Sequence, residues 1–304
     1  YGERGRVILF VATLLVIVLV VATLLRWIDH LARLGHLTQT TDRVESAAGK
    51  ALADRLAHPC LGAAPLTHRA PPDGALPVTQ DKVGYVQHLD VAGLASLAEE
   101  LDAEIWVTAP PGTFLHPALP LAWLVGGRLS EDSVARLRDT FVVGDQRSFR
   151  QDPRFGLAVL AEIASRALSP AVNDAGTAID VIARGVRLLS RWPGVAEQAA
   201  MQGAARHRRL RLAPLSIADL FDDLFGPIER DGAASLAVQM RLQKALRVLH
   251  GLDDPAARLA ARDHARLALK RALAALPLRE DQLILEDLAA WAVAEGDPPR
   301  TRQS

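Results

Sequence analysis

The chain is poor in cysteine, and this shortage excludes one class of protein at once. Its 304 residues include a single cysteine, Cys60, so no intramolecular disulfide can form. A disulfide-stabilised extracellular scaffold is therefore excluded, and a reducing compartment is favoured. Cys60 has no second cysteine at C-x-x-C spacing, and we interpret it as an inert or incidental thiol.

The sequence also lacks an excess of charge of either sign. Its 35 basic residues balance 35 acidic ones, so the formal net charge is zero. A neutral chain has no global field that attracts nucleic acid, and we predict no nucleic-acid partner. Lysine and asparagine are scarce, which indicates a compositional bias, and Asn173 is the only asparagine.

Sequence motifs of common enzymes and metal sites are missing as well. The chain contains no Walker loop, no G-x-G-x-x-G after a strand, no H-E-x-x-H and no G-x-S-x-G. Its nine histidines are scattered, without the close spacing and acidic companions of a metal site. We therefore predict no catalytic residue, no cofactor and no metal, and we prefer a non-enzymatic function.

One long hydrophobic run lies near the start of the chain. Residues 7–25 carry no charge, and as a helix they would be about 28 Å long, which matches the hydrocarbon core of a bilayer. Arg26 can snorkel toward headgroups, and Trp27 stands where an interfacial aromatic belongs. The run is too long for a signal peptide, and no A-x-A site follows it. It predicts a transmembrane helix, with the lipid bilayer as partner.

The region after the membrane segment reads as an amphipathic helix that extends it as a stalk. Its acidic and basic residues nearly balance, so we prefer packing against a neighbouring subunit or upstream helices over lipid binding. This predicts a homo-oligomer. Basic residues flank both ends of the hydrophobic run and orient it weakly, but the lone thiol and the large region that follows favour a cytoplasmic body.

The remaining patterns predict a small α/β domain followed by helices. β-branched and aromatic residues predict strands at 83–90, 105–109, 121–125 and 140–143. The fold class is thus one N-terminal transmembrane helix plus a mostly α-helical soluble region containing a small mixed α/β subdomain. The predicted segments are a transmembrane helix (7–26), an amphipathic stalk helix (27–58), a Pro/Gly linker (59–82), a small α/β domain (83–145), a helical hairpin with a polar corner (146–194), a basic connector (195–215), a helical C-terminal region (216–295) and a disordered tail (296–304).

Two polar motifs flank the first helix of the predicted hairpin and form its polar corner. The candidate residues are Arg150, Gln151, Asp152, Ser169, Asn173 and Asp174. They have two interpretations. As caps, Asp152 begins the first helix, Asn173 or Asp174 begins the second, and Ser169 caps a turn; as a ligand site, they surround one pocket in which Arg150 holds an anion. We prefer capping, because it explains these residue types without a ligand.

Two basic clusters stand out in the C-terminal half. Residues 206–211 hold four arginines and a histidine, and we expect them to pair with the acidic run at residues 219–229. Four basic side chains recur every fourth residue from Arg258 to Lys270, and we interpret this ridge as a solvated or salt-bridged face.

Four motifs in order resemble a known family. They are Gly84-Tyr-Val-Gln-His-Leu-Asp90, Pro111-Gly-Thr-Phe114, Gln151-Asp-Pro-Arg-Phe-Gly156 and Ala167-Leu-Ser-Pro-Ala-Val-Asn-Asp174. This series is similar to the bacterial predicted membrane protein family called domain of unknown function 2254, over residues 7 to about 192. The resemblance implies a bacterial inner-membrane location. It also implies further transmembrane helices upstream, so that this chain would be the C-terminal piece of a longer protein. It implies no activity.

Two hypotheses of function follow. The first is a non-enzymatic, oligomeric assembly that is channel-like, transport-linked or signal-coupling and has a cytosolic regulatory domain. A single span cannot enclose a pore, so the channel-like form requires a ring of subunits or further helices. The alternative is a membrane-anchored enzyme or ligand-binding module that uses the polar corner.

Overall fold

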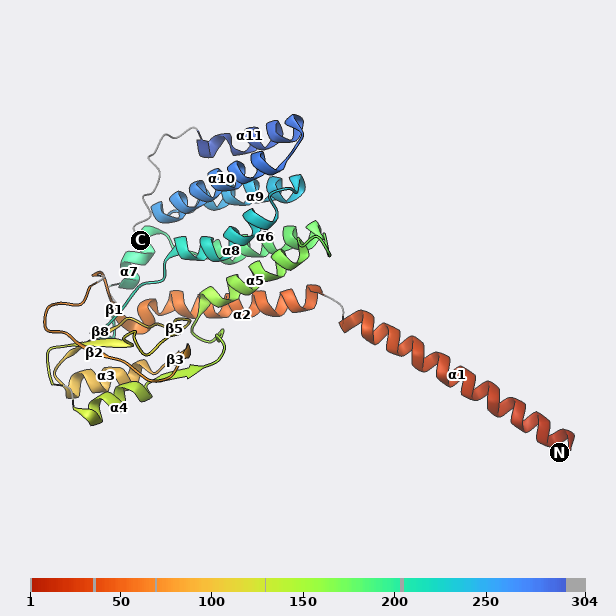
Figure 1. Ribbon diagram of the computed structural model, residues 1–304, viewed down its shortest axis with the longest axis horizontal. Helices are drawn as coiled ribbons and strands as arrows, with labels where there is room; N and C mark the ends of the chain where they lie inside the picture. Colours follow the sequence, from red (N-terminus) through yellow and green to blue (C-terminus); the bar gives the residue numbers. More distant parts are fainter. Residues whose placement is uncertain (1, 35–36, 69, 129, 203–204, 294–304) are drawn as a thin grey trace. The chain divides into compact units, whose positions relative to one another are not determined.

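The computed structural model describes residues 2–34, 37–68, 70–128, 130–202 and 205–293 of the chain (Figure 1). The described chain divides into two compact units, which we call the N-terminal unit (residues 1–43) and the body (residues 44–304). The predicted tail at residues 296–304 lies outside the described residues.

The N-terminal unit is dominated by one long apolar helix, α1 (Glu3–Leu34). Its segment Ile8–Trp27 is long and apolar enough to cross a membrane, with a mean hydropathy of 3.2, and none of it is buried. The hydroxyls of Thr13 and Thr23 donate to backbone oxygens one turn earlier, at 2.8 and 2.7 Å. Both polar side chains are therefore satisfied within the helix, as a hydrocarbon environment requires.

The predicted stalk segment covers the last residues of the first helix and the helix that follows it. The first helix ends at Leu34, and α2 (Leu37–Ala57) begins after two residues that the structure does not describe. Ala48 and Leu52 on the second half of α2 are buried in the main core of the body. This half of α2 is thus part of the body, and the apolar spacing read as a stalk reflects packing within the same chain.

The larger part of the body is a stack of helices (Figure 1). These helices are α5 (Pro153–Ala167), α6 (Ala175–Leu189), α8 (Ile217–Asp231), α9 (Leu236–His250), α10 (Pro255–Ala275) and α11 (Arg279–Val293). α5 packs against α6 and α8, and α10 packs against α8, α9 and α11. The core between them is apolar and includes the fully buried Phe221, Leu224 and Phe225. The short helix α7 (Val195–Gln202) follows α6 in the chain.

The smaller part of the body contains two sheets with a separate hydrophobic core. Their strands are β1 (Ala63–Pro65), β2 (Leu76–Val78), β3 (Gly84–Leu89), β4 (Glu104–Val107), β5 (Phe114–Leu115), β6 (Ala122–Val125), β7 (Phe141–Gly144) and β8 (His207–Leu212). Five strands pair in the order β1-β8-β4-β6-β2, and three pair in the order β5-β3-β7. β8 runs parallel to β1 and β4, whereas the other pairs are antiparallel. The helices α3 (Val91–Glu100) and α4 (Glu131–Asp139) belong to this part.

The segment predicted as a basic connector contains β8, an inner strand of the larger sheet. Leu210 and Leu212 are buried, whereas the side chains between them are partly exposed. Arg209 pairs with Glu99 and Asp102, and Arg211 pairs with Glu104. The expected pairing with the acidic run at residues 219–229 is therefore wrong. Arg209 and Arg211 lie on the partly exposed face of β8, where they pair with carboxylates of α3, of β4 and of the turn between them.

The predicted linker also contains structure, namely the 3-10 helix η1 (Pro59–Gly62), β1 and β2. These strands are only three residues long and are defined by pairing with distant parts of the chain, so local composition does not predict them. The predicted basic ridge on α10 is likewise not a solvated face throughout. Arg262 is 9% exposed, and Arg266 donates from Nε to the backbone oxygen of Ala292 at 2.6 Å.

Candidate functional site

The two predicted polar motifs lie at opposite ends of α5. Gln151 and Asp152 precede its first residue, and Ser169 follows its last turn. A helix of 15 residues is about 22 Å long. The structure therefore does not bring the two motifs together around one pocket.

Asp152 fixes the N-terminal end of α5 through several contacts. It is 2% exposed, and its Oδ1 accepts from the backbone N–H of Phe155 at 3.2 Å, which is the predicted N-cap. Arg147 donates to the same carboxylate from Nε at 2.8 Å and from Nη2 at 3.0 Å. A Cβ at Gly112, where φ is +96°, would lie 2.4 Å from Asp152 Oδ2. Two of the four family-like motifs thus meet at this carboxylate.

The rest of the Gln151–Gly156 motif holds α5 against its neighbours. Arg154 pairs with Asp223 at 2.6 Å and with Asp219 at 2.7 Å on α8. A Cβ at Gly156 would lie 2.3 Å from the Cβ of Ala48, so this glycine permits the close crossing of α5 and α2. The motif is therefore largely a packing motif.

The C-terminal end of α5 is held by local hydrogen bonds. Ser169 donates from Oγ to the backbone oxygen of Arg166 at 2.7 Å. Asn173 has φ of 50°, a left-handed conformation that asparagine tolerates better than most residues, which accounts for the only asparagine in the chain. Asp174 caps α6 and accepts from the N–H and hydroxyl of Thr177, which lower the pKa of the Asp174 carboxyl. Asp174 therefore caps α6, whereas Ser169 bonds back to the last turn of α5.

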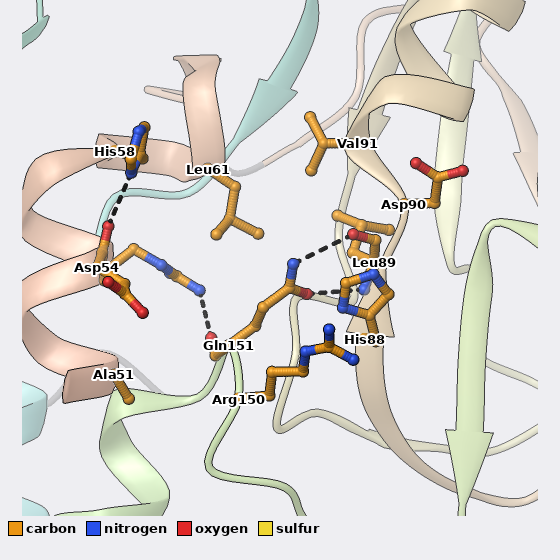
Figure 2. A pocket seen from close by; sticks show the side chains of 11 residues that line it. Ala51, Asp54, His58, Leu61, His88, Leu89, Asp90, Val91, Arg150 and Gln151 are labelled. Carbon is orange, nitrogen blue, oxygen red and sulfur yellow. Dashed lines mark hydrogen bonds between the residues drawn. The ribbon is translucent and has the colours of Figure 1, made fainter. Parts of the chain in front are cut away.

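A pocket of about 480 Å³ lies beside the N-terminal end of α5 (Figure 2). Its walls come from the last turns of α2, from η1, from the end of β3 and the start of α3, and from the loop before α5. The lining residues are Ala51, Asp54, Arg55, His58, Leu61, His88, Leu89, Asp90, Val91, Arg150 and Gln151. Two of the six predicted corner residues, Arg150 and Gln151, thus line a pocket.

Gln151 joins the wall formed by β3 to the loop before α5. Its Oε1 accepts from the backbone N–H of Leu89 at 2.8 Å, and its Nε2 donates to the backbone oxygen of Leu89 at 3.3 Å (Figure 2). The amide therefore pairs with the strand end as a further strand would. This pairing fixes the backbone from which the neighbouring Arg150 extends.

Arg55 joins α2 to the same loop. It is 6% exposed, and its Nη2 donates to the backbone oxygen of Gln151 at 2.7 Å. Burial lowers the pKa of the Arg55 guanidinium, and the nearby Cys60 and Asp152 act in the opposite direction. Its buried Nε has no hydrogen-bond partner among the described residues. A buried arginine with spare donor capacity is costly unless a ligand or water satisfies it.

His88, on the opposite wall, has a similar unsatisfied atom. Its Nδ1 is buried without a hydrogen-bond partner in the described part of the chain. Sequence analysis missed both Arg55 and His88 as pocket residues. Arg55 looked like one of several polar residues on a stalk, and its contact with Gln151 spans 96 positions. His88 is one of nine scattered histidines without metal-site spacing, so the spacing of the histidines does not identify it as a pocket residue.

A second cluster of titratable groups is buried among the helices. Glu229 on α8 is fully buried and accepts from Arg271 Nη1 at 2.9 Å and from His264 Nδ1. His264 Nε2 faces Asp222 Oδ1 at 3.2 Å. Burial opposes the charged imidazole, but the hydrogen bonds to Asp222 and Glu229 outweigh it and raise the pKa of His264 to about 9. At neutral pH this cluster is a satisfied ion-pair network, and it lines none of the pockets described.

Within the residues that the structure describes, no group of three or more His, Cys, Asp or Glu side chains could hold a metal ion. The polar lining of the pocket combines arginine, histidine and amide side chains with the carboxylates of Asp54 and Asp90. The nitrogen donors of this set are suited to binding an oxygen-rich ligand.

An apolar helix that could span a membrane, followed by a mixed α/β and helical body, defines a class of candidate membrane-anchored proteins. A family model described as "Predicted membrane protein (DUF2254)" matches residues 2–248, which is most of the chain. The chain belongs to this family. The resemblance seen in the four sequence motifs is thereby confirmed.

The relatives found among curated proteins are themselves uncharacterised. One protein of Mycobacterium bovis and one of Mycobacterium tuberculosis are each 34% identical to the chain over 121 residues. The aligned part is 38% of this chain and 23% of each relative, so the chain spans only part of their length. No solved structure matches the chain.

Proposed function

We propose that the chain is a membrane-anchored regulatory module that binds a small polar ligand in the pocket beside α5 and passes the effect on through α2. One observation carries the proposal. The last turns of α2 form a wall of the pocket, and α2 is the helix that follows α1 in the chain. This proposal joins the signal-coupling hypothesis to the ligand-binding alternative.

The size and chemistry of the pocket support ligand binding. Its volume of about 480 Å³ lies within the range of small-molecule sites. Arg55 and His88 each present a buried nitrogen without a partner among the described residues. Both side chains line the pocket, so a molecule bound there could complete their hydrogen bonding.

Arg55 provides the route by which binding would affect α2. Its guanidinium is held by the backbone oxygen of Gln151, and Gln151 is held in turn by Leu89 of β3. A ligand that binds Arg55 changes the balance between these contacts. The ligand can shift α2 only if it binds one arrangement of the Arg55–Gln151 contact more tightly than another.

The ligand-binding part of the proposal is tested by affinity-selection mass spectrometry with a mycobacterial small-molecule extract. Val91→Trp fills the pocket, whereas Val195→Trp places the same side chain at the exposed first position of α7. The full chain in lipid nanodiscs should retain a compound that Val195→Trp also retains and Val91→Trp loses. Equal retention by both variants, or no retained compound, would contradict the proposal.

Membrane anchoring is the second part of the proposal. We infer that α1 spans a bacterial inner membrane with the body in the cytoplasm, because its apolar side chains are exposed and its two threonines are satisfied internally. A reporter fused after residue 304 should be active on the cytoplasmic side. Activity on the outer side would reverse the topology.

Self-association is the third part, because a single span cannot enclose a pore and a channel-like form would need a ring of subunits or further helices. Chemical crosslinking in membranes, followed by native mass spectrometry, should yield a homo-oligomer. A uniform monomer would exclude an oligomeric assembly, including the channel-like form, while leaving ligand binding intact.

A further inference from the structure

We propose that the pocket beside α5 is a phosphate-binding site, and that its ligand is a soluble small molecule that carries a phosphate group. This inference rests on the proposed ligand-binding function and specifies its chemistry. It is carried by three side chains with nitrogen donors, Arg55, His88 and Arg150, which line one pocket from different elements of the fold.

Arg150 supplies the most accessible positive charge. The residue is exposed and lines the pocket, and its guanidinium has no hydrogen bond or ion pair with any described residue. Figure 2 shows its side chain extending from the loop before α5 on the side of the pocket where His88 lies. An arginine that is free of partners at a pocket can bind two oxygens of a phosphate at once.

Two deeper donors complete the set. Arg55 is 6% exposed and has a buried Nε without a described partner, and the buried Nδ1 of His88 is in the same situation. Arg55 belongs to α2, His88 to β3 and Arg150 to the loop before α5, so the donors surround the ligand from different directions. A tetrahedral phosphate has enough oxygens for such a set, whereas a carboxylate has two.

The start of α3 adds a fourth contribution. Val91, its first residue, lines the pocket, and α3 has ten residues. Asp90 accepts from the N–H of Gly93, so this carboxylate is engaged as the N-cap. The N–H groups of the first turn and the helix dipole favour an anion there.

Two carboxylates in the lining oppose an anion, namely Asp90, which caps α3, and Asp54. Asp54 is exposed, and its carboxylate faces the same pocket as Arg150. A carboxylate beside a bound phosphate weakens phosphate binding through charge repulsion. Removal of the positive charge of Arg150 should therefore weaken phosphate binding, whereas removal of the negative charge of Asp54 should strengthen it. A pocket that only stabilises the fold would not produce these opposite effects.

The test is a 31P NMR titration of the full chain in zwitterionic nanodiscs with inorganic phosphate at constant ionic strength. Wild-type protein should bind phosphate saturably. Arg150→Gln should weaken binding about tenfold or more, Asp54→Asn should strengthen it about threefold, and Val91→Trp should abolish it. Arg247→Gln on α9, which removes an exposed arginine elsewhere, should leave the dissociation constant unchanged.

Nanodiscs that contain phosphatidylglycerol distinguish a soluble ligand from a lipid headgroup. Unchanged phosphate affinity in them supports the soluble ligand, whereas competition by the lipid would overturn that part. Absence of saturable binding, or weakening by Asp54→Asn, would overturn the phosphate assignment. In the affinity selection, one outcome is that wild-type protein retains a neutral or cationic compound that Val91→Trp does not retain. If phosphate does not bind in that case, the phosphate inference fails and the proposed ligand-binding function stands.

Discussion

The two ends of α5 carry similar polar residues and differ in what those residues contact. At the C-terminal end, Ser169 and Asp174 make hydrogen bonds within a few positions along the chain. At the N-terminal end, Gln151 contacts β3 and Arg55 of α2, 62 and 96 positions away. A capping residue thus needs only its own helix, whereas a pocket needs distant elements. The same residue types serve both purposes, and only the long-range contacts separate them.

The largest expected effect is the loss of Asp152. Asp152→Ala removes a buried ion pair with Arg147 and an N-cap, and it should lower the free energy of unfolding by about 4 kcal/mol. Urea denaturation of the full chain in detergent measures the change. Asp174→Ala, which removes a half-buried cap without an ion pair, should have less than about half this effect. Equal losses would remove the contrast between the two ends.

The buried network around His264 should make the free energy of unfolding depend on pH, which the local caps at the C-terminal end of α5 do not require. Because the pKa of His264 is raised to about 9 in the folded chain, the charged imidazole stabilises the fold fully below the unfolded pKa of about 6.5. This stability, on the order of 3 kcal/mol, should be lost as the pH rises from about 6.5 through about 9. Denaturation midpoints measured across this range test the prediction. His264→Gln should flatten the pH dependence of the denaturation midpoint. An unchanged pH dependence in that variant would assign the effect to other titratable groups.

Gly112 offers a test of the contact between the Pro111-Gly turn and the α5 cap. Gly112→Ala should cost about 2 kcal/mol, because φ is +96° and the new Cβ meets Asp152 Oδ2. Gly126→Ala is the matched control, with φ of +77° and no atom within 4 Å of the new Cβ. It should cost about 1 kcal/mol from backbone strain alone. If both variants lose the same stability, the contact with Asp152 contributes nothing.

The smallest expected effects concern Asn173. Asn173→Ala should cost about 1 kcal/mol because φ is 50°, whereas Asn173→Gly should be nearly neutral. Thermal unfolding of both variants separates the two cases. A large loss in the glycine variant would indicate that the amide side chain has a role beyond the backbone conformation.

Sequence periodicity predicted the elements whose signal is local. The strands from β3 to β7, apart from the two-residue β5, and the helices of the C-terminal half follow the expected patterns. The strand β8 was missed because its arginines looked like a charged connector. Its pairing with β1 and β4 depends on residues more than 90 positions away.

The candidate site was predictable only in part, for the same reason. Gln151 and Arg150 were identified from their motif, but Arg55 and His88 become pocket residues only when α2 and β3 are brought to the same loop. A residue such as Arg55, which reads as a solvated helix position, is buried by a contact that no local pattern encodes.

The most direct test of the account is hydrogen–deuterium exchange of the full chain in nanodiscs, with and without the small-molecule extract. The account predicts slower exchange for the pocket amides at residues 88–93 and 150–152, where Leu89 and Gln151 are paired, and no change at residues 169–174. Protection confined to residues 169–174, or no protection at the pocket, would contradict the assignment of the ligand site to the N-terminal end of α5.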